Sequence, residues 1–228
     1  MGYELVQNWL PEWKYGLKAP YPMQPQGIVV HNTAGASSAK DVISAMINND
    51  AFTSFHVAID EAFAVEAIPF SRNAWHAGDG GEGYANRNLI GIEICRDMDW
   101  SSNLYDLAEQ NAVDYIAEVC LQFGWTSANL HQHNWYCSTS CPHRLKGHWE
   151  DFKRKVDEKI NALSAGLPTE KTTDAQENSV KVKLHGYERT VRGENKDGTV
   201  YVAIRDLVSQ MGYEVSFADG VVNVEYKK

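Results

Sequence analysis

The segment covering residues 133–143, HNWYCSTSCPH, places a histidine eight positions before a cysteine, and His31 ends a distant apolar run, GIVVH. Zinc readily binds imidazole nitrogen and thiolate sulfur, and three protein ligands with a fourth position left for water are typical of catalytic zinc sites. The candidate ligands His31, His133 and Cys141 lack the paired Cys-x2-Cys spacings of a zinc finger. The sequence therefore predicts a metal that joins elements of an already folded domain.

Length and composition indicate an ordinary globular protein. With 228 residues, 43% of them hydrophobic and 22% charged, the chain is long enough for one large and one small domain. No apolar stretch approaches the length of a membrane span, and the first residues, MGYELVQNWLPEWKYG, lack the basic and apolar regions of a secretory signal. The net charge of −9 argues against nucleic acid as the main partner.

The four cysteines are too few and too irregularly spaced for a disulfide scaffold, and we expect free thiols. A disulfide between Cys137 and Cys141 is the alternative. The cysteine followed by proline and histidine, with His133 eight positions earlier, is the more specific signal for a metal ligand.

Hydrophobic periodicity predicts an α/β domain with a mixed central sheet flanked by helices. We expect strands over 27–31, 55–60, 64–69 and 89–95, with the middle two forming a hairpin and a glycine-rich loop following them through Gly83. We expect helices over about 38–49, 104–123 and 147–163. The second of these should stop at Gly124, because apolar residues recur at intervals of three and four up to that glycine.

The polar segment 164–179 contains glycine and proline without an apolar period, and we expect it to link domains over 1–163 and 180–228. Residues 180–228 alternate apolar and polar positions around Asp-Gly turns, which predicts a ββαββ unit with a helix over about 204–211. This tail holds eight Lys and Arg against seven Asp and Glu, so the negative charge belongs to the first domain.

Five motifs give the chain a specific resemblance over about residues 20–160. They are HNT at His31, SFHVAID around His56, NAWHAGDG around His76, GIEIC around Glu93, and HNWYCSTSCPH. With them the chain resembles the type-2, zinc-dependent N-acetylmuramoyl-L-alanine amidases. That family includes phage endolysins, bacterial autolysins and the animal peptidoglycan recognition proteins.

The resemblance implies zinc ligands at His31, His133 and Cys141. His131 competes for the second ligand position, but the family's eight-residue spacing to the cysteine selects His133. Glu93 lies in an apolar strand, where a carboxylate is costly unless it is paired or useful. The resemblance implies that Glu93 takes a proton from the attacking water and passes it to the leaving amine. The alternative is an ion pair with an arginine such as Arg96.

Two positions depart from the phage enzymes. Where these often carry an oxyanion-stabilising lysine, this chain has Thr139, as catalytic animal relatives do; the alternative is a loop hydroxyl that bonds its own backbone. Phe55 replaces a tyrosine of some relatives. His143 is expected to orient the site rather than to bind as a fourth ligand, which would close it. The residues expected to contact substrate in the cleft are Asn32, His56, Trp75, His76 and Asn86.

The resemblance implies hydrolysis of the amide between N-acetylmuramic acid and L-alanine in bacterial peptidoglycan, and we expect a phage or prophage endolysin held in the host cytoplasm until lysis. The rival function is a non-catalytic peptidoglycan receptor of the same fold, which typically lacks the cysteine. A glycosidase would need two flanking carboxylates, and no comparable pair is evident. The tail is similar to the stalk domain also named after the copper amine oxidase N-terminus, and we expect it to bind cell wall or mediate self-association.

Overall fold

The computed structural model describes residues 2–166 and the strands at 179–184, 187–196, 199–202, 213–218 and 221–226. By its internal contacts the chain divides into two compact units, residues 1–167 and 168–228. Most of the segment 164–179 lies outside the described residues, but its first three residues belong to helix α5, Trp149–Gly166, which continues past the expected end at 163.

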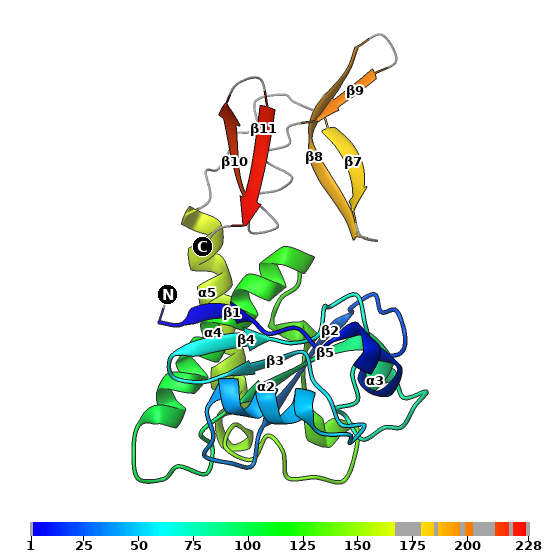
Figure 1. The fold of residues 1–228 in the computed structure, drawn as a ribbon. Coiled ribbons are helices and arrows are strands. Elements are labelled where there is room, and N and C mark those ends of the chain that lie inside the picture. Colours follow the sequence, from blue (N-terminus) through cyan, green and yellow to red (C-terminus); the bar gives the residue numbers. More distant parts are fainter. Residues whose placement is uncertain are drawn as a thin grey trace. The chain divides into compact units, whose positions relative to one another are not determined.

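A six-stranded mixed sheet organises the first unit (Figure 1). Its order is β1 (Glu4–Gln7), β4 (Phe63–Glu66), β3 (Val57–Ile59), β5 (Leu89–Ile94), β2 (Gly27–Asn32) and β6 (Leu130–Gln132). All neighbours pair in parallel except β3 and β4, the expected hairpin. Strand β2 is buried at all six positions, as an apolar run between two parallel neighbours should be.

Helices cover both faces of this sheet, so the expected α/β class is confirmed (Figure 1). Helices α4 (Leu104–Phe123) and α5 pack on the face that carries Ile28, Val30 and Ile92. Helix α2 (Ala39–Asn48) packs with Ala58 and Val65 on the other face. Two short helices, α1 (Tyr15–Lys18) and α3 (Tyr84–Asn88), were not anticipated.

The helix ends follow the local sequence signals. The hydroxyl of Ser38 accepts the amide N–H of Asp41 at 3.2 Å and begins α2. Gly124 ends α4 with a φ of +69°, a left-handed conformation that favours glycine over other residues. No helix among residues 2–166 is long and apolar enough to cross a membrane.

The described strands of the second unit form two antiparallel groups. The first is a sheet of β7 (Ser179–Leu184), β8 (Tyr187–Lys196) and β9 (Thr199–Val202), and the second is a hairpin of β10 (Tyr213–Ala218) and β11 (Val221–Tyr226). Three strands therefore precede residues 203–212, whereas the expected ββαββ unit has two strands before its helix. The expected helix over 204–211 lies outside the described residues.

Arg96 fixes the chain where β5 ends. Its guanidinium donates two hydrogen bonds of 2.8 Å to the carboxylate of Glu61, in the β3–β4 turn, and a third to the carbonyl of Ala36. Arg96 therefore pairs with Glu61 and not with Glu93. The paired guanidinium lowers the pKa of Glu61 below its usual range.

We predict that Glu61→Gln lowers the free energy of unfolding at pH 7 by about 1 kcal/mol, because it removes a two-bond, charge-assisted contact that is four-fifths buried. Since the folded pKa is lowered, this contribution is present above the unfolded pKa and is lost as pH falls through the folded value. Urea unfolding of both proteins from pH 7 downward measures the difference. Glu82→Gln, at an exposed ion pair with Arg87, is the matched control.

Candidate active site

Three residues from distant parts of the chain converge at the carboxyl ends of the central strands. His31 lies near the end of β2, His133 begins the turn after β6, and Cys141 lies in the loop that follows. The two Nδ1 atoms are 3.0 Å apart, and the Sγ of Cys141 is 3.9 Å from Nδ1 of His31. One ligand atom from each residue lies within 4.8 Å of the others, so the set could hold a metal ion.

Glu93 stands beside this cluster because of strand register. Parallel strands β2 and β5 pair His31 with Glu93, so both side chains leave the same face of the sheet. The Oε1 of Glu93 is 4.0 Å from Nδ1 of His31, and its Oε2 is buried without a hydrogen-bond partner among the described residues. Burial, and to a smaller extent Asp97, raise the pKa of Glu93 to about 8. An unpartnered buried carboxylate oxygen is typical of a site that receives a cation or a proton donor.

Cys141 is held by its neighbours in the orientation of a ligand. Its Sγ accepts the backbone N–H of Asn32 at 3.2 Å, and its own N–H donates to the hydroxyl of Thr139 at 3.2 Å. Burial raises the pKa of the Cys141 thiol to about 12, and nearby Glu93 adds to the shift. A thiolate at this place therefore needs a cation beside it. All four cysteines lie in the described part of the chain as free thiols, as expected.

The loop that carries Cys141 is anchored by the two residues after Pro142. His143 is not part of the cluster of candidate ligands, and its Nε2 is 3.3 Å from the buried carboxylate of Asp97. The N–H of Arg144 donates to the side-chain oxygen of Asn32 at 3.0 Å. Its guanidinium lies 4.1 Å from the ring centres of both Trp100 and Tyr105. These contacts hold the end of the loop, at His143 and Arg144, against Asp97, β2 and the start of α4.

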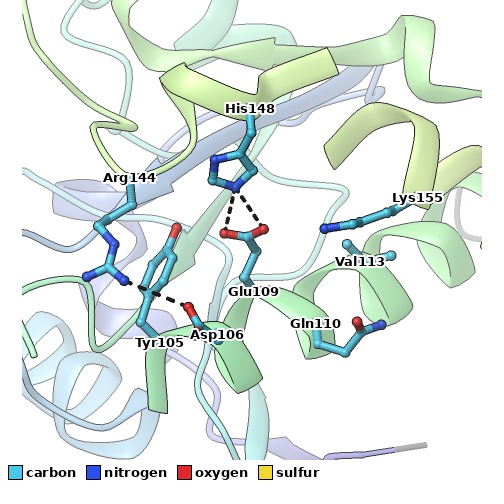
Figure 2. A pocket seen from close by; sticks show the side chains of 8 residues that line it. All are labelled: Tyr105, Asp106, Glu109, Gln110, Val113, Arg144, His148 and Lys155. Carbon is cyan, nitrogen blue, oxygen red and sulfur yellow. Dashed lines mark hydrogen bonds and ion pairs between the residues drawn. The ribbon is translucent and has the colours of Figure 1, made fainter. Parts of the chain in front are cut away.

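Beyond Arg144 a cavity of about 340 Å³ opens between α4 and the start of α5, and Figure 2 shows its lining. The charged groups there are paired within the protein. His148 Nε2 lies 2.9 Å from a carboxylate oxygen of Glu109, and Arg144 lies 3.8 Å from Asp106. Lys155 pairs with Asp151 of its own helix at 2.9 Å. The segment before α5 is thus joined to α4 by the contacts of Arg144 and His148, and these polar groups are not left for a ligand.

His56 and His76 lie beneath the site, which differs from their expected place in a cleft wall. The ring of His56 is fully buried; its Nδ1 accepts the N–H of Gly91, and its Nε2 is 2.9 Å from the carbonyl of Arg72. His76 is 6% exposed and stands between His31 and the carbonyl of Leu89. Burial lowers the pKa of His56 to about 4 and that of His76 to about 3, so both rings are neutral.

The other residues expected in the cleft also have structural partners. The side-chain oxygen of buried Asn86 accepts the backbone N–H groups of His76 and Ala77, both at 2.8 Å. Asn32 is 6% exposed and donates to the hydroxyl of Tyr105 at 3.2 Å. Half-buried Trp75 donates its indole N–H to the carbonyl of Leu17. Of the five residues, Trp75 is the one with substantial exposed surface.

His131 lies outside the cluster, since β6 ends between it and His133. Its Nδ1 is 2.7 Å from the hydroxyl of Tyr136. Cys137, which the sequence offers as a possible disulfide partner of Cys141, instead lies beside the cluster, with its Sγ 3.2 Å from Nε2 of His133. Trp135, which was not singled out from the sequence, is 53% exposed and its ring contacts that of His131.

Comparison with known proteins identifies the family. The sequence profile described as N-acetylmuramoyl-L-alanine amidase matches residues 21–144. The amidase CwlA of Bacillus subtilis (strain 168) is 36% identical over 193 residues, which cover 81% of this chain and 71% of CwlA. A CwlA from Bacillus sp. is 33% identical over 230 residues, covering 97% of this chain and 88% of that protein.

Two further similarities concern phage lysins and solved structures. Endolysin LysK of Staphylococcus phage K is 33% identical over 129 residues, which cover 53% of this chain and 26% of LysK. The structure of PlyL superimposes with a TM-score of 0.65 at 37% identity, covering 68% of this chain and 98% of PlyL. The chain belongs to the N-acetylmuramoyl-L-alanine amidase family, which confirms the expected family and enzyme class and supports peptidoglycan as the substrate.

Proposed function

We propose that the chain binds one zinc ion through His31, His133 and Cys141. Tetrahedral zinc, with bonds of about 2.05 Å to nitrogen and about 2.3 Å to sulfur, separates two nitrogens by about 3.3 Å and nitrogen from sulfur by about 3.6 Å. The corresponding separations are 3.0 Å and 3.9 Å. This agreement is the observation that carries the proposal. Three protein ligands leave a coordination position open, as catalysis requires.

The reaction is hydrolysis of the amide between the lactyl group of N-acetylmuramic acid and L-alanine. Zinc, when bound, polarises the amide carbonyl and acidifies a water molecule. Glu93 is the proposed acceptor of a proton from the attacking water, because its Oε1 lies 4.0 Å from Nδ1 of His31 and its buried Oε2 has no hydrogen-bond partner among the described residues. It then delivers that proton to the nitrogen of the leaving L-alanine.

Thr139 is the proposed donor to the oxyanion. Its oxygen accepts the N–H of Cys141, and that contact leaves the hydroxyl hydrogen available to a substrate oxygen. Of the expected substrate contacts, Trp75 keeps this role in the proposal. Asn32, His56, His76 and Asn86 are proposed to hold the site from beneath, because their polar atoms are already engaged in buried hydrogen bonds.

The setting we propose is that of a phage or prophage endolysin, which stays in the host cytoplasm until lysis. The similarity to LysK supports this setting. A receptor that only binds peptidoglycan is not favoured, since such a protein has no use for the complete His, His and Cys set beside a buried carboxylate.

We predict that Cys141→Ser reduces the zinc retained after dialysis from about one ion per chain to well below that, and abolishes lysis, because a serine hydroxyl is a weak ligand for zinc. His131→Ala, two residues from a ligand but outside the cluster, should retain both zinc and activity. Elemental analysis of the purified proteins is the measurement. Full zinc content in the Cys141→Ser protein would rule out this ligand assignment.

We predict that Glu93→Gln lowers turnover by roughly 10²–10⁴-fold, since glutamine keeps the shape of the side chain but cannot accept the proton. Zinc content and binding to purified walls should stay at the parent level. Release of new L-alanine amino termini from walls measures turnover, and reducing sugar ends serve as the control product. Turnover within a few-fold of the parent would exclude Glu93 as the base.

For residues 180–228 we propose a cell-wall anchor joined to the catalytic domain, residues 1–163, by the linker 164–179. The contact division near residue 167 supports separate units, and the long alignment with the Bacillus sp. amidase extends over this tail. Self-association through this unit is the alternative role. The comparisons do not support the resemblance of residues 180–228 to a stalk domain. An acidic catalytic domain gains no electrostatic attraction to an anionic wall, which makes an anchor useful.

We predict that a shortened chain, residues 1–167, cleaves soluble muropeptides at the parent rate but lyses intact cells more slowly. Tethering raises the local substrate concentration without changing the chemistry. Cosedimentation of the full and shortened chains with purified walls tests binding directly. Equal lysis and equal sedimentation would contradict the anchor, and the solution mass of both chains would then test self-association.

A further inference from the structure

A chain of hydrogen-bonded groups runs beneath the metal-ligand cluster. The Nε2 of His76 lies 3.1 Å from the carbonyl oxygen of Leu89, and its Nδ1 lies 3.0 Å from Nε2 of His31. The other ring nitrogen of His31, Nδ1, is the atom that faces His133 and Cys141. The chain therefore links a backbone carbonyl in β5 to a proposed metal ligand through one buried imidazole.

The carbonyl at one end determines where the protons lie. A carbonyl oxygen only accepts, so the Nε2 of His76 must carry the hydrogen. A neutral imidazole has a single N–H, so the Nδ1 of His76 accepts, and the Nε2 of His31 must donate to it. This leaves the Nδ1 of His31 with a free lone pair directed at the cluster. A charged His76 would reverse this order, but its ring is buried without a carboxylate partner.

Packing holds the His76 ring in this position. A Cβ atom on Gly91 would lie 2.6 Å from Cγ of His76, so the ring fills the space that the absent side chain leaves. The backbone N–H of His76 donates to the side chain of Asn86 at 2.8 Å. Both the ring plane and the main chain of His76 are therefore fixed before any metal arrives.

We propose that His76 is a positioning residue that selects the tautomer of His31 and so presents Nδ1, not Nε2, to the metal. The identity of that metal as zinc rests on the proposed function. Metal-bound histidines commonly donate their second N–H to a carboxylate or a carbonyl. Here the Nε2–H group of His31 donates to the neutral ring of His76, which in turn donates to the carbonyl of Leu89. Cys141 and Glu93 already bring two acidic groups to the site. A neutral histidine in place of a carboxylate as the partner of His31 therefore adds no further negative charge.

Two substitutions of His76 in the full-length protein separate hydrogen bonding from packing. His76→Gln keeps an amide oxygen for His31 and an amide hydrogen for Leu89, whereas His76→Phe keeps the ring volume without either group. We expect zinc affinity, measured by competition with a chromogenic chelator, to fall about 10–100-fold in His76→Phe and only a few-fold in His76→Gln. His131→Gln, outside the chain of contacts, is the control and should bind zinc as the parent does.

Nitrogen-15 NMR of the histidine rings in the metal-free parent tests the tautomer directly. We expect His31 to be protonated at Nε2 and unprotonated at Nδ1. A proton on Nδ1, or an equal mixture of tautomers, would overturn the inference, as would parent-like zinc affinity in His76→Phe. The NMR result decides the matter even if His76→Phe does not fold. A parent protein that binds no zinc would instead refute the proposed metal and leave the tautomer measurement standing.

Discussion

The parallel pairing of β2 with β5 is the constraint on which the site depends. Its register sets His31 opposite Glu93, and the alternation of side chains sends both to one face of the sheet. A shift of either strand by a single residue would turn its own side chain, His31 or Glu93, into the apolar layer beneath α4 and α5. The apolar residues of both strands hold the register from that side. The same burial that stabilises the sheet therefore also places Glu93, the proposed base, beside His31, a proposed metal ligand.

The position of Cys141, a proposed ligand, depends on a second set of contacts, which tie the loop at 137–145 to the end of β2. Asn32 is central here, because its backbone N–H reaches Cys141 while its side chain joins Tyr105 and Arg144. Arg144 in turn packs against the rings of Trp100, before α4, and Tyr105, in its first turn. A loop with few apolar residues is thus held by polar contacts to rigid elements, which fixes Cys141 relative to the sheet.

Much of this arrangement could be predicted from the sequence where the signal is local. The bounds of α4 and the buried strands β2 and β5 followed from periodicity and from Gly124. The short elements β1, α1 and α3 were missed because four or five residues give too little periodicity to detect. The sequence motifs correctly predicted that His31, His133 and Cys141 lie close together. They could not show that His56 and His76 lie beneath the site, since burial is set by partners distant in the chain, such as Gly91.

The site is built from groups that burial keeps neutral. The thiol of Cys141 and the carboxyl of Glu93 both have raised pKa values, while His56 and His76 are held uncharged beneath them. A charged group here would need a compensating partner, and no Lys or Arg of the described residues pairs with Glu93. A divalent cation, as proposed for this site, would supply that compensation for the thiolate and the carboxylate together. The burial that makes these acids costly to ionise on their own is thus the physical reason why a cation is proposed for this cluster.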